Sequence, residues 1–223
     1  NISNANSTGF KKTSVMFSEF YNGRTPHGVE SSLVGLGANA EVSRRSDAQG
    51  SLIEMGGALD AAIVGNGYFM TQHPDQVGYS VTRNGAFSLD NEGFLVTQDG
   101  DFVLGINAVN ENFLDLGVVG TELERIQVPV KDSNEPLSSI SIGNNGDILA
   151  AFGEEFEVPV ATLPLTIFSN PSGLKQLGSG KYSPTDLSGK VFLGNPSSPG
   201  FGDLETGYVE GSNVDITTEM TNM

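Results

Sequence analysis

Two histidines are the first side chains to consider for acid–base or metal chemistry. His27 lies near Arg24 and Pro26, and His73 precedes Pro74. Their spacing does not bring both to one metal ion, and no motif places either beside a serine and an aspartate, as a hydrolase triad requires. We interpret both as surface histidines.

Two glycine patterns could present backbone N–H groups to a phosphate if each led into a helix. Residues 35–40 resemble a dinucleotide-binding fingerprint, but residues 41–44 continue as strand or coil. Residues 178–181 resemble part of a P-loop, yet Lys175 occupies the first glycine position and Tyr182 the position of the magnesium-binding serine or threonine. We interpret the second pattern as a turn and expect no phosphate site.

Acidic side chains gather at Asp99 with Asp101, and at Glu154, Glu155 and Glu157. Carboxylates are ligands for hard cations, but neither group has the spacing of an EF-hand loop. Turn chemistry accounts for the first group, and a solvated strand edge that discourages unwanted pairing accounts for the second. We therefore expect no metal site and no cofactor.

The composition excludes further classes of function. Cysteine is absent, which removes disulfides, thiolate metal sites and cysteine nucleophiles. The formal net charge is −16, from 11 lysines and arginines against 27 aspartates and glutamates, so the summed field repels nucleic acid and anionic lipid. No apolar run approaches the roughly 20 residues of a membrane helix, so no membrane insertion is expected. An acidic, solvated surface keeps a secreted protein soluble, and we interpret the negative charge in this way.

The elements that must position any site are short strands bounded by turn residues, a pattern typical of an all-β domain. Asn84-Gly85 predicts a type I′ hairpin turn. Residues 90–93 and 99–100 predict the next turns of a meander, and Asn145-Gly146 predicts another hairpin. Strands are expected at 61–64, 68–70, 79–83, 86–89, 94–97, 102–104, 125–130, 139–142, 148–152, 156–160 and 163–168.

The chain divides into three regions. Residues 1–57 form an N-terminal arm, residues 58–208 a β-rich body, and residues 209–223 the start of a C-terminal helix with Asn213 or Asp215 as its N-cap. Within the body, residues 169–202 are rich in proline and glycine and are expected to be mostly loop. Because the chain lacks an initial methionine and stops where a helix begins, we expect a fragment. The predicted fold class is mainly β: a bent, turn-rich antiparallel domain with an extended arm and one helix start.

Four stretches of the chain match the signatures of one protein family. They read NISNANSTGFK at residues 1–11, LDAAI at 59–63 followed by GYF at 67–69, YSVTRNGAFSLDNEGFLV at 79–96, and GYVEGSNVD at 207–215 followed by EMTNM at 219–223. The third stretch is long and specific, and the order and spacing agree across nearly the whole chain. Together the stretches resemble the bacterial flagellar hook and rod axial protein family.

The resemblance implies a structural protein and not an enzyme. Terminal helices outside this chain would pair as a coiled coil inside a tube, and the β body would form the tube wall. The implied partners are copies of the same chain in a helical polymer, neighbouring axial proteins, and hook cap or junction proteins. The positions that the resemblance assigns to the family motifs and to assembly are Asn4, Gly9, Phe10, Leu59, Asp60, Gly67, Phe69, Tyr79, Arg83, Asn84, Gly85, Gly93, Glu210, Ser212, Asn213, Val214, Glu219 and Met220.

Hook and rod are hard to separate on sequence. The tail at residues 210–215 favours the hook, whereas the lack of a large inserted outer domain favours a rod or a minimal hook. We favour the hook narrowly, with the distal rod of the basal body as the alternative. A hook subunit would lie outside the cell, and a rod subunit would span the periplasm.

Two other classes remain open from the residues alone. A secreted adhesin or glycan-binding module would use glycine- and asparagine-rich turns and the tyrosines Tyr68, Tyr79 and Tyr208, which we expect to be exposed. A hydrolase with paired carboxylates such as Asp60 and Asp90 has only the abundance of acidic residues in its favour.

Overall fold

The structure, a computed structural model, describes residues 1–21, 35–75, 77–107, 123–129, 131–132, 135–153 and 157–221. Five residues named above lie outside the described residues: Arg24, Pro26, His27, Glu154 and Glu155. Within the described part the regular secondary structure is almost entirely antiparallel β, which confirms the predicted fold class.

The elements follow one another in short steps, as the turn-rich sequence predicts. In the first half they are η1 (Ile2–Asn4), β1 (Thr13–Tyr21), β2 (Gly35–Arg45), β3 (Leu52–Glu54), β4 (Ala61–Val64), β5 (Phe69–Gln72), β6 (Ser80–Thr82), β7 (Phe87–Leu89), β8 (Leu95–Thr97) and β9 (Phe102–Asn107). In the second half they are β10 (Glu124–Arg125), β11 (Lys131–Asp132), β12 (Glu135–Ile142), β13 (Asp147–Phe152), β14 (Val158–Thr162), β15 (Leu165–Phe168), η2 (Pro171–Gly173), β16 (Lys175–Gly178), β17 (Lys181–Ser183), η3 (Asp186–Ser188), β18 (Val191–Gly194), β19 (Asp203–Thr206), β20 (Tyr208–Glu210) and α1 (Ile216–Thr221).

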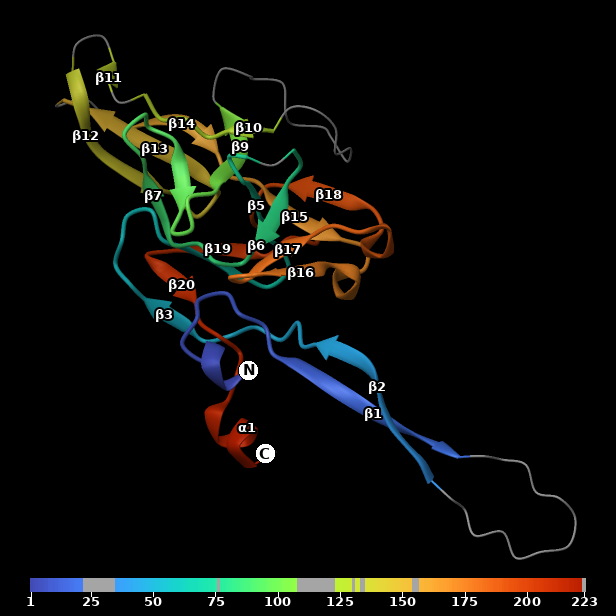
Figure 1. Cartoon of the computed structure of the whole chain (residues 1–223). Helices are drawn as coiled ribbons and strands as arrows, with labels where there is room; N and C mark the ends of the chain where they lie inside the picture. The colour runs from blue at the N-terminus through green and yellow to red at the C-terminus, as the bar shows by residue number, and fades with distance from the viewer. Residues whose placement is uncertain are drawn as a thin grey trace, which may run out of the picture.

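One large sheet forms the centre of the body. Its strands lie in the order β11-β12-β13-β14-β9-β5-β6-β17-β16, and β10, β8 and β7 join it beside β9. The pairs β15–β18, β4–β19 and β3–β20 form smaller sheets around it. The β1–β2 ribbon extends away from the body (Figure 1). The two chain ends lie close together on the side of the body from which the ribbon leaves (Figure 1).

Two apolar cores pack on the central strands. Successive side chains of a strand point to opposite faces of a sheet. Phe69 and Val103 therefore join a large core, while their neighbours Met70 and Leu104 join a smaller one. The larger core also takes residues from β4, β7, β8, β12, β13, β15 and β19, and the smaller one includes Tyr68, Val81 and Tyr182. Both faces of β5 and β9 are thus buried.

Three of the predicted turns are confirmed by their glycines. Gly93, Gly100 and Gly146 have φ values of 84°, 82° and 87°, in the left-handed region that glycine adopts at little cost. They connect β7 to β8, β8 to β9 and β12 to β13, and each of these strand pairs is antiparallel. The glycine-rich sequence at 178–181 is also a turn, between β16 and β17.

The predicted Asn84-Gly85 hairpin is wrong. The strands before and after it do not pair with each other: β6 pairs with β5 and β17, and β7 pairs with β8. Neither Asn84 nor Gly85 has a positive φ. Instead, the backbone N–H of Ala86 donates to Asn84 Oδ1 at 3.2 Å, and Ala61 N donates to Gly85 O at 3.0 Å. A distant strand, β4, therefore determines the conformation here.

Two further expectations need correction. The region 169–202 contains β16, β17 and β18 as well as η2 and η3, because tight glycine turns allow very short strands to pair. The expected strand at 125–130 is reduced to β10 and one isolated bridge at Gln127. By contrast, Asp215 is confirmed as a helix cap, since Thr217 N donates to its Oδ1 at 2.9 Å.

Candidate assembly site

Segments far apart in the sequence meet at Glu210, the last residue of β20. The N–H of Gly9 donates to the backbone carbonyl of Glu210 at 2.7 Å. The N–H of Gly50 donates to the Glu210 side chain, at Oε1, at 2.8 Å. β20 itself pairs with β3. The N-terminal segment, the connection after β2 and the C-terminal strand are therefore joined at one point.

Three buried charges form the centre of this junction, and we call Lys11, Arg83 and Glu210 the junction triad. Lys11 Nζ lies 2.5 Å from Glu210 Oε1, and Arg83 Nε lies 2.8 Å from Glu210 Oε2. The second contact is an ion pair without a straight hydrogen bond, since neither atom has a well-aligned partner. The side chains of Lys11, Arg83 and Glu210 are 1%, 5% and 0% exposed. Removing one partner from such a pair costs about 3–5 kcal/mol, because the other charge stays buried.

Backbone carbonyls complete the coordination of the two cations. Lys11 Nζ donates to Ala48 O at 2.8 Å, and Arg83 Nη2 donates to Gly65 O at 2.6 Å. Burial lowers the pKa of Lys11, the charge of Arg83 lowers it further, and Glu210 opposes both effects. Because the unfolded chain then holds this proton more tightly than the folded one, the titration of Lys11 raises the free energy of unfolding as pH rises from the lowered pKa to the ordinary value of 10.5. At neutral pH Glu210 is what makes the buried ammonium tolerable.

Asn213 joins the same segments through neutral hydrogen bonds. Its Oδ1 accepts from Lys12 N at 2.6 Å, and its Nδ2 donates to Ala48 O at 2.8 Å and to Ser46 O at 3.1 Å. Its backbone N–H donates to Phe10 O at 3.3 Å. The chain leaving β20 toward α1 is therefore held against the chain entering β1.

Gly9 lets the N-terminal segment approach the body closely. Its φ is +68°, and a Cβ placed there would lie 2.7 Å from the backbone nitrogen of Asn84. A side chain at this position would be both strained and blocked by backbone. The contact explains physically why a glycine lies next to Phe10, which is itself buried.

A third cation, Arg45 at the end of β2, lies beside the triad. Its guanidinium lies 4.5 Å from the centre of the Tyr182 ring, and its Nη2 donates to Pro171 O at 2.5 Å and to Tyr68 Oη at 3.4 Å. Burial raises the pKa of Tyr182 to about 12 and also raises that of Tyr68. The expectation that Tyr68 is exposed is wrong: it is 5% exposed, because β5 is covered on both faces. Tyr79 and Tyr208 are half-buried.

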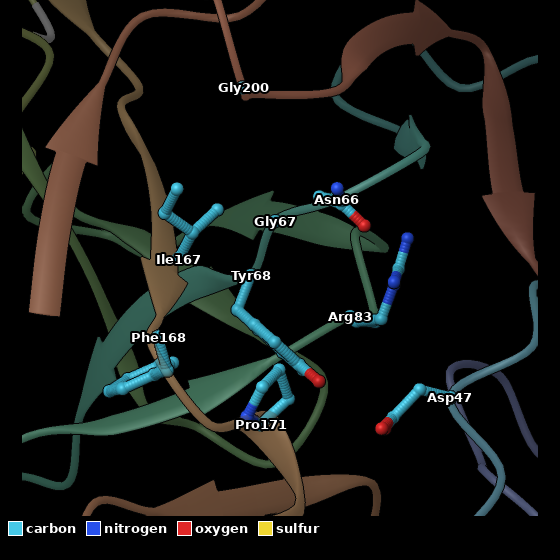
Figure 2. A pocket seen from close by; sticks show the side chains of 9 residues that line it. All are labelled: Asp47, Asn66, Gly67, Tyr68, Arg83, Ile167, Phe168, Pro171 and Gly200. Carbon is cyan, nitrogen blue, oxygen red and sulfur yellow. The ribbon is translucent and has the colours of Figure 1, made fainter. Parts of the chain in front are cut away.

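Beside these residues lies a pocket of about 190 Å³. Figure 2 shows Arg83 and Asp47 on one side of it and Tyr68, Ile167 and Phe168 on the other. Its lining is Asp47, Asn66, Gly67, Tyr68, Arg83, Ile167, Phe168, Pro171 and Gly200. This lining holds no serine, cysteine, lysine or histidine, and Arg83 is already paired with Glu210. Asp47 is likewise paired with Arg45, so both charged side chains of the lining are already held in ion pairs.

At the outer end of the junction, α1 contacts the N-terminal segment. Glu219 Oε1 lies 2.5 Å from Lys12 Nζ, and Asn1 Nδ2 donates to Glu219 Oε2 at 2.9 Å. The hydrogen bond from Lys12, and then the one from Asn1, hold the pKa of Glu219 below its ordinary value of 4.5. The charged carboxylate therefore stabilises the contact above pH 4.5, and this contribution is lost as pH falls through the lowered pKa of the folded state.

The Lys12 contact gives a direct titration test. In a carboxyl ¹³C NMR titration, we expect the Glu219 midpoint below 4.5 in the wild type and a rise toward 4.5 in Lys12→Met. Asp215 serves as the internal control, because its pKa is lowered by hydrogen bonds from Thr218 and Thr217 and not by Lys12. A Glu219 midpoint that does not move in Lys12→Met would contradict the contact.

The structure brings some of the predicted assembly residues together at the junction. These are Gly9, Phe10, Arg83, Asn84, Glu210, Ser212, Asn213 and Val214. Others lie in the β body, namely Leu59, Asp60, Gly67, Phe69, Tyr79, Gly85 and Gly93. Asn4, Glu219 and Met220 lie at η1 and α1. Their part in assembly stays a prediction.

Sequence reasoning missed Lys11 and Arg45 as junction residues. Lys11 belongs to the first family stretch, but lysine at a chain end is normally exposed. The available signal was that a buried Glu210 needs a cation, and Lys11 follows an apolar Gly9-Phe10 pair that has to pack. Arg45 carries no comparable signal, because its partners Pro171 and Tyr182 are distant in the chain.

The carboxylates considered for chemistry have local structural partners. Asp101 and Asp99 hold Lys181, at 2.7 and 3.3 Å from its Nζ. Asp90 Oδ1 accepts from two backbone N–H groups of its own turn, and Asp60 Oδ2 accepts from Gly57 N. Within the described ranges no group of three or more His, Cys, Asp or Glu side chains is placed to bind a metal ion. No described helix is long and apolar enough to cross a membrane.

Comparison with known proteins decides between the open classes. Residues 62–150 match the family model of the flagellar hook protein FlgE/F/G D1 domain, and residues 205–223 match that of the flagellar basal body rod FlgEFG protein C-terminal region. The flagellar basal-body rod protein FlgG of Agrobacterium fabrum is 32% identical over 100% of this chain and 80% of its own length. This chain belongs to the flagellar hook and rod protein family.

Other relatives in the family differ in how much of the chain they cover. FlgG of Bacillus subtilis is 34% identical over 100% of this chain and 80% of its own length. The Salmonella typhimurium flagellar hook protein FlgE is 36% identical, but over 39% of this chain and 22% of its own length. A crystal structure of the Helicobacter pylori flagellar hook protein FlgE2 shares 19% identity over 64% of this chain and 38% of that chain, with a TM-score of 0.29.

Membership of the hook and rod family fixes the general function. The chain is a structural subunit of the flagellar axis and not an enzyme. It assembles into a polymer with other axial proteins of the flagellum, an exported structure. The narrow preference for the hook is not supported, because the rod relatives match over the whole chain and the hook relative over a part.

Proposed function

We propose that this protein is a rod subunit of the flagellar basal body. It polymerises with copies of itself into a helical tube that crosses the periplasm and transmits torque from the motor. The observation that carries the proposal is the match to basal-body rod proteins over 100% of the chain at 32% and 34% identity. The neighbours above and below would be other axial proteins of the rod and hook.

The junction supports a torque-bearing role. A rod subunit has to pass load between the helices at its chain ends and the body that forms the tube wall. The junction triad joins the two ends to the body with buried, charge-assisted contacts, which are stronger than neutral hydrogen bonds. Residues 1–57 would serve as the arm, 58–208 as the wall and 209–223 as the start of the inner helix. The motif residues at the junction would keep these three parts in one orientation.

Localisation on purified basal bodies tests the proposal. The full-length protein, carrying an epitope tag in the exposed turn at Gly78, replaces the native copy in a motile strain, and gold label is located by electron microscopy. We expect label along the rod and restored swimming. Label on the hook alone would reject the rod in favour of the hook. Label away from the flagellum would reject both.

A further inference from the structure

One corner of the β body presents an unpaired strand edge. β16 is the last strand of the sheet path, it pairs with β17 alone in the described part, and all of its residues are exposed. Such edges are normally shielded, because their free N–H and C=O groups invite pairing with another chain. We call β16 together with residues 185–192 the β16 corner.

Hydrogen bonds make this corner a rigid platform. Ser169 N donates to Lys190 O at 3.1 Å, and Asn170 N donates to Ser188 O at 3.0 Å. Thr185 Oγ1 donates to Gly173 O at 2.6 Å, just before β16 begins. On this platform the side chains of Leu177, Leu187 and Phe192 are 53%, 77% and 37% exposed. These exposed apolar side chains are available for a partner to cover.

The charge of the β16 corner is unusual for this chain. Six other cations have partners: Lys11, Lys12, Arg45, Arg83 and Lys181 contact carboxylates, and Arg125 donates to Gln72 and lies over the Phe102 ring. Lys175 and Lys190 are exposed and have no carboxylate partner among the described residues. The β16 corner also contains exposed Asp186, so two lysines against one aspartate leave it with a net charge of +1 in a chain of net charge −16, and an acidic surface can dock there.

An acidic, apolar surface that complements it lies across the same sheet. The first residues of β14 pair with β13, whereas β9 reaches β14 at Ala161 and Thr162 alone. Among the described residues, positions 157–159 have no strand partner on the side away from β13, and all three are exposed. Glu157 has no cation partner among the described residues, and Val158 is 44% exposed. We call residues 157–159 the β14 lip.

We propose that the β16 corner of one copy binds the β14 lip of the next copy. Lys175 and Lys190 would face Glu157, and the exposed leucines would cover Val158. β9, β5, β6 and β17 separate the two surfaces along the sheet path, and they lie on different parts of the body (Figure 1). A contact between different patches on each copy does not close as a twofold dimer, and it builds a helical polymer when successive copies do not close into a ring. The proposal rests on the proposed function, because it concerns copies of the same chain.

A charge swap tests this contact in the full-length protein. Polymerisation is followed by sedimentation, and the critical concentration is measured for the wild type, Lys175→Glu/Lys190→Glu, Glu157→Lys and the combination of all three. Each partial variant places like charges opposite each other, and we expect its critical concentration to rise at least about tenfold. The combination restores the opposite charges and should return close to the wild-type value. Glu205→Lys, at an exposed position of β19, controls for the change of +2 in net charge that Glu157→Lys brings.

The outcomes distinguish a failure of this copy-to-copy contact from a failure of the proposed function. If the wild type polymerises and the partial variants behave like Glu205→Lys, the contact is wrong while the proposed function stands. If each partial variant is impaired and the combination is not rescued, the two surfaces bind different partners, and the copy-to-copy contact is rejected. If the full-length wild type forms no polymer at any salt concentration, both this inference and the proposed polymerisation fall.

Discussion

Replacing Glu210 with glutamine is expected to lower the free energy of unfolding by about 3–5 kcal/mol. The side chain keeps its size, but Lys11 and Arg83 lose their carboxylate while they stay 1% and 5% exposed. Gly50 N also exchanges a charged acceptor for a neutral one. Urea unfolding of the wild type and Glu210→Gln, compared at equal m values, measures the difference.

Two further variants make the Glu210 result specific. Glu205→Gln changes an exposed glutamate of the neighbouring strand β19 and should alter the free energy of unfolding by no more than about 0.5 kcal/mol. Adding Lys11→Met to Glu210→Gln removes one of the two unpaired cations, so the double variant should lose less than the sum of the single losses. A Glu210→Gln effect as small as that of Glu205→Gln would mean that the triad does not stabilise the junction.

The Glu210→Gln variant also tests whether the stability of the junction matters for function. Glu210 accepts hydrogen bonds from Gly9 and Gly50 and contacts two cations, so it joins the arm and the helix start to the wall. In the rod proposal, load passes between these parts at every subunit. Weakening the junction should therefore impair swimming more than a substitution in the outer wall that lowers the free energy of unfolding by the same amount. Motility plates measure the difference between the two variants at matched protein levels.

Local signals explain how much of the fold is predictable from sequence. The turns at Gly93, Gly100 and Gly146 follow from the sequence, because a glycine that must adopt a positive φ carries its reason within a few residues. Asp215 is predictable as a cap for the same reason. The buried position of Tyr68 is not, since the cover on its second face comes from other segments, including Phe168 and Tyr182.

The candidate site is the part that sequence could not assemble. Lys11 and Glu210 are 199 residues apart, and their pairing depends on the arm folding back beside β20. Family motifs did select Gly9, Arg83, Glu210 and Asn213, but they gave no reason why those positions belong together. The reason is spatial: one buried carboxylate, two cations and a glycine without a side chain meet at a single point.

Gly85 shows how a distant contact can override a strong local signal. Asn-Gly normally indicates a type I′ turn, in which the glycine adopts a positive φ. Here a Cβ at Gly85 would lie 1.7 Å from the carbonyl oxygen of Ala61 and 3.0 Å from Cε2 of Phe69. Both neighbours are completely buried, and Ala61 N is hydrogen-bonded to Gly85 O. The glycine is therefore required by close packing and not by its φ.

The two explanations predict different costs for Gly85→Ala. In a type I′ turn the alanine would be strained by a positive φ alone, at about 1–2 kcal/mol. Against the Ala61 carbonyl it must displace β4 or its own backbone, which we expect to cost about 3 kcal/mol, the upper end of the usual overpacking range. Gly100→Ala is the matched control, because Gly100 has a φ of +82° and no atom lies within 4 Å of the place that a Cβ would occupy there. In urea unfolding, we expect Gly85→Ala to lose more free energy of unfolding than Gly100→Ala. Equal losses in the two variants would support the hairpin explanation instead.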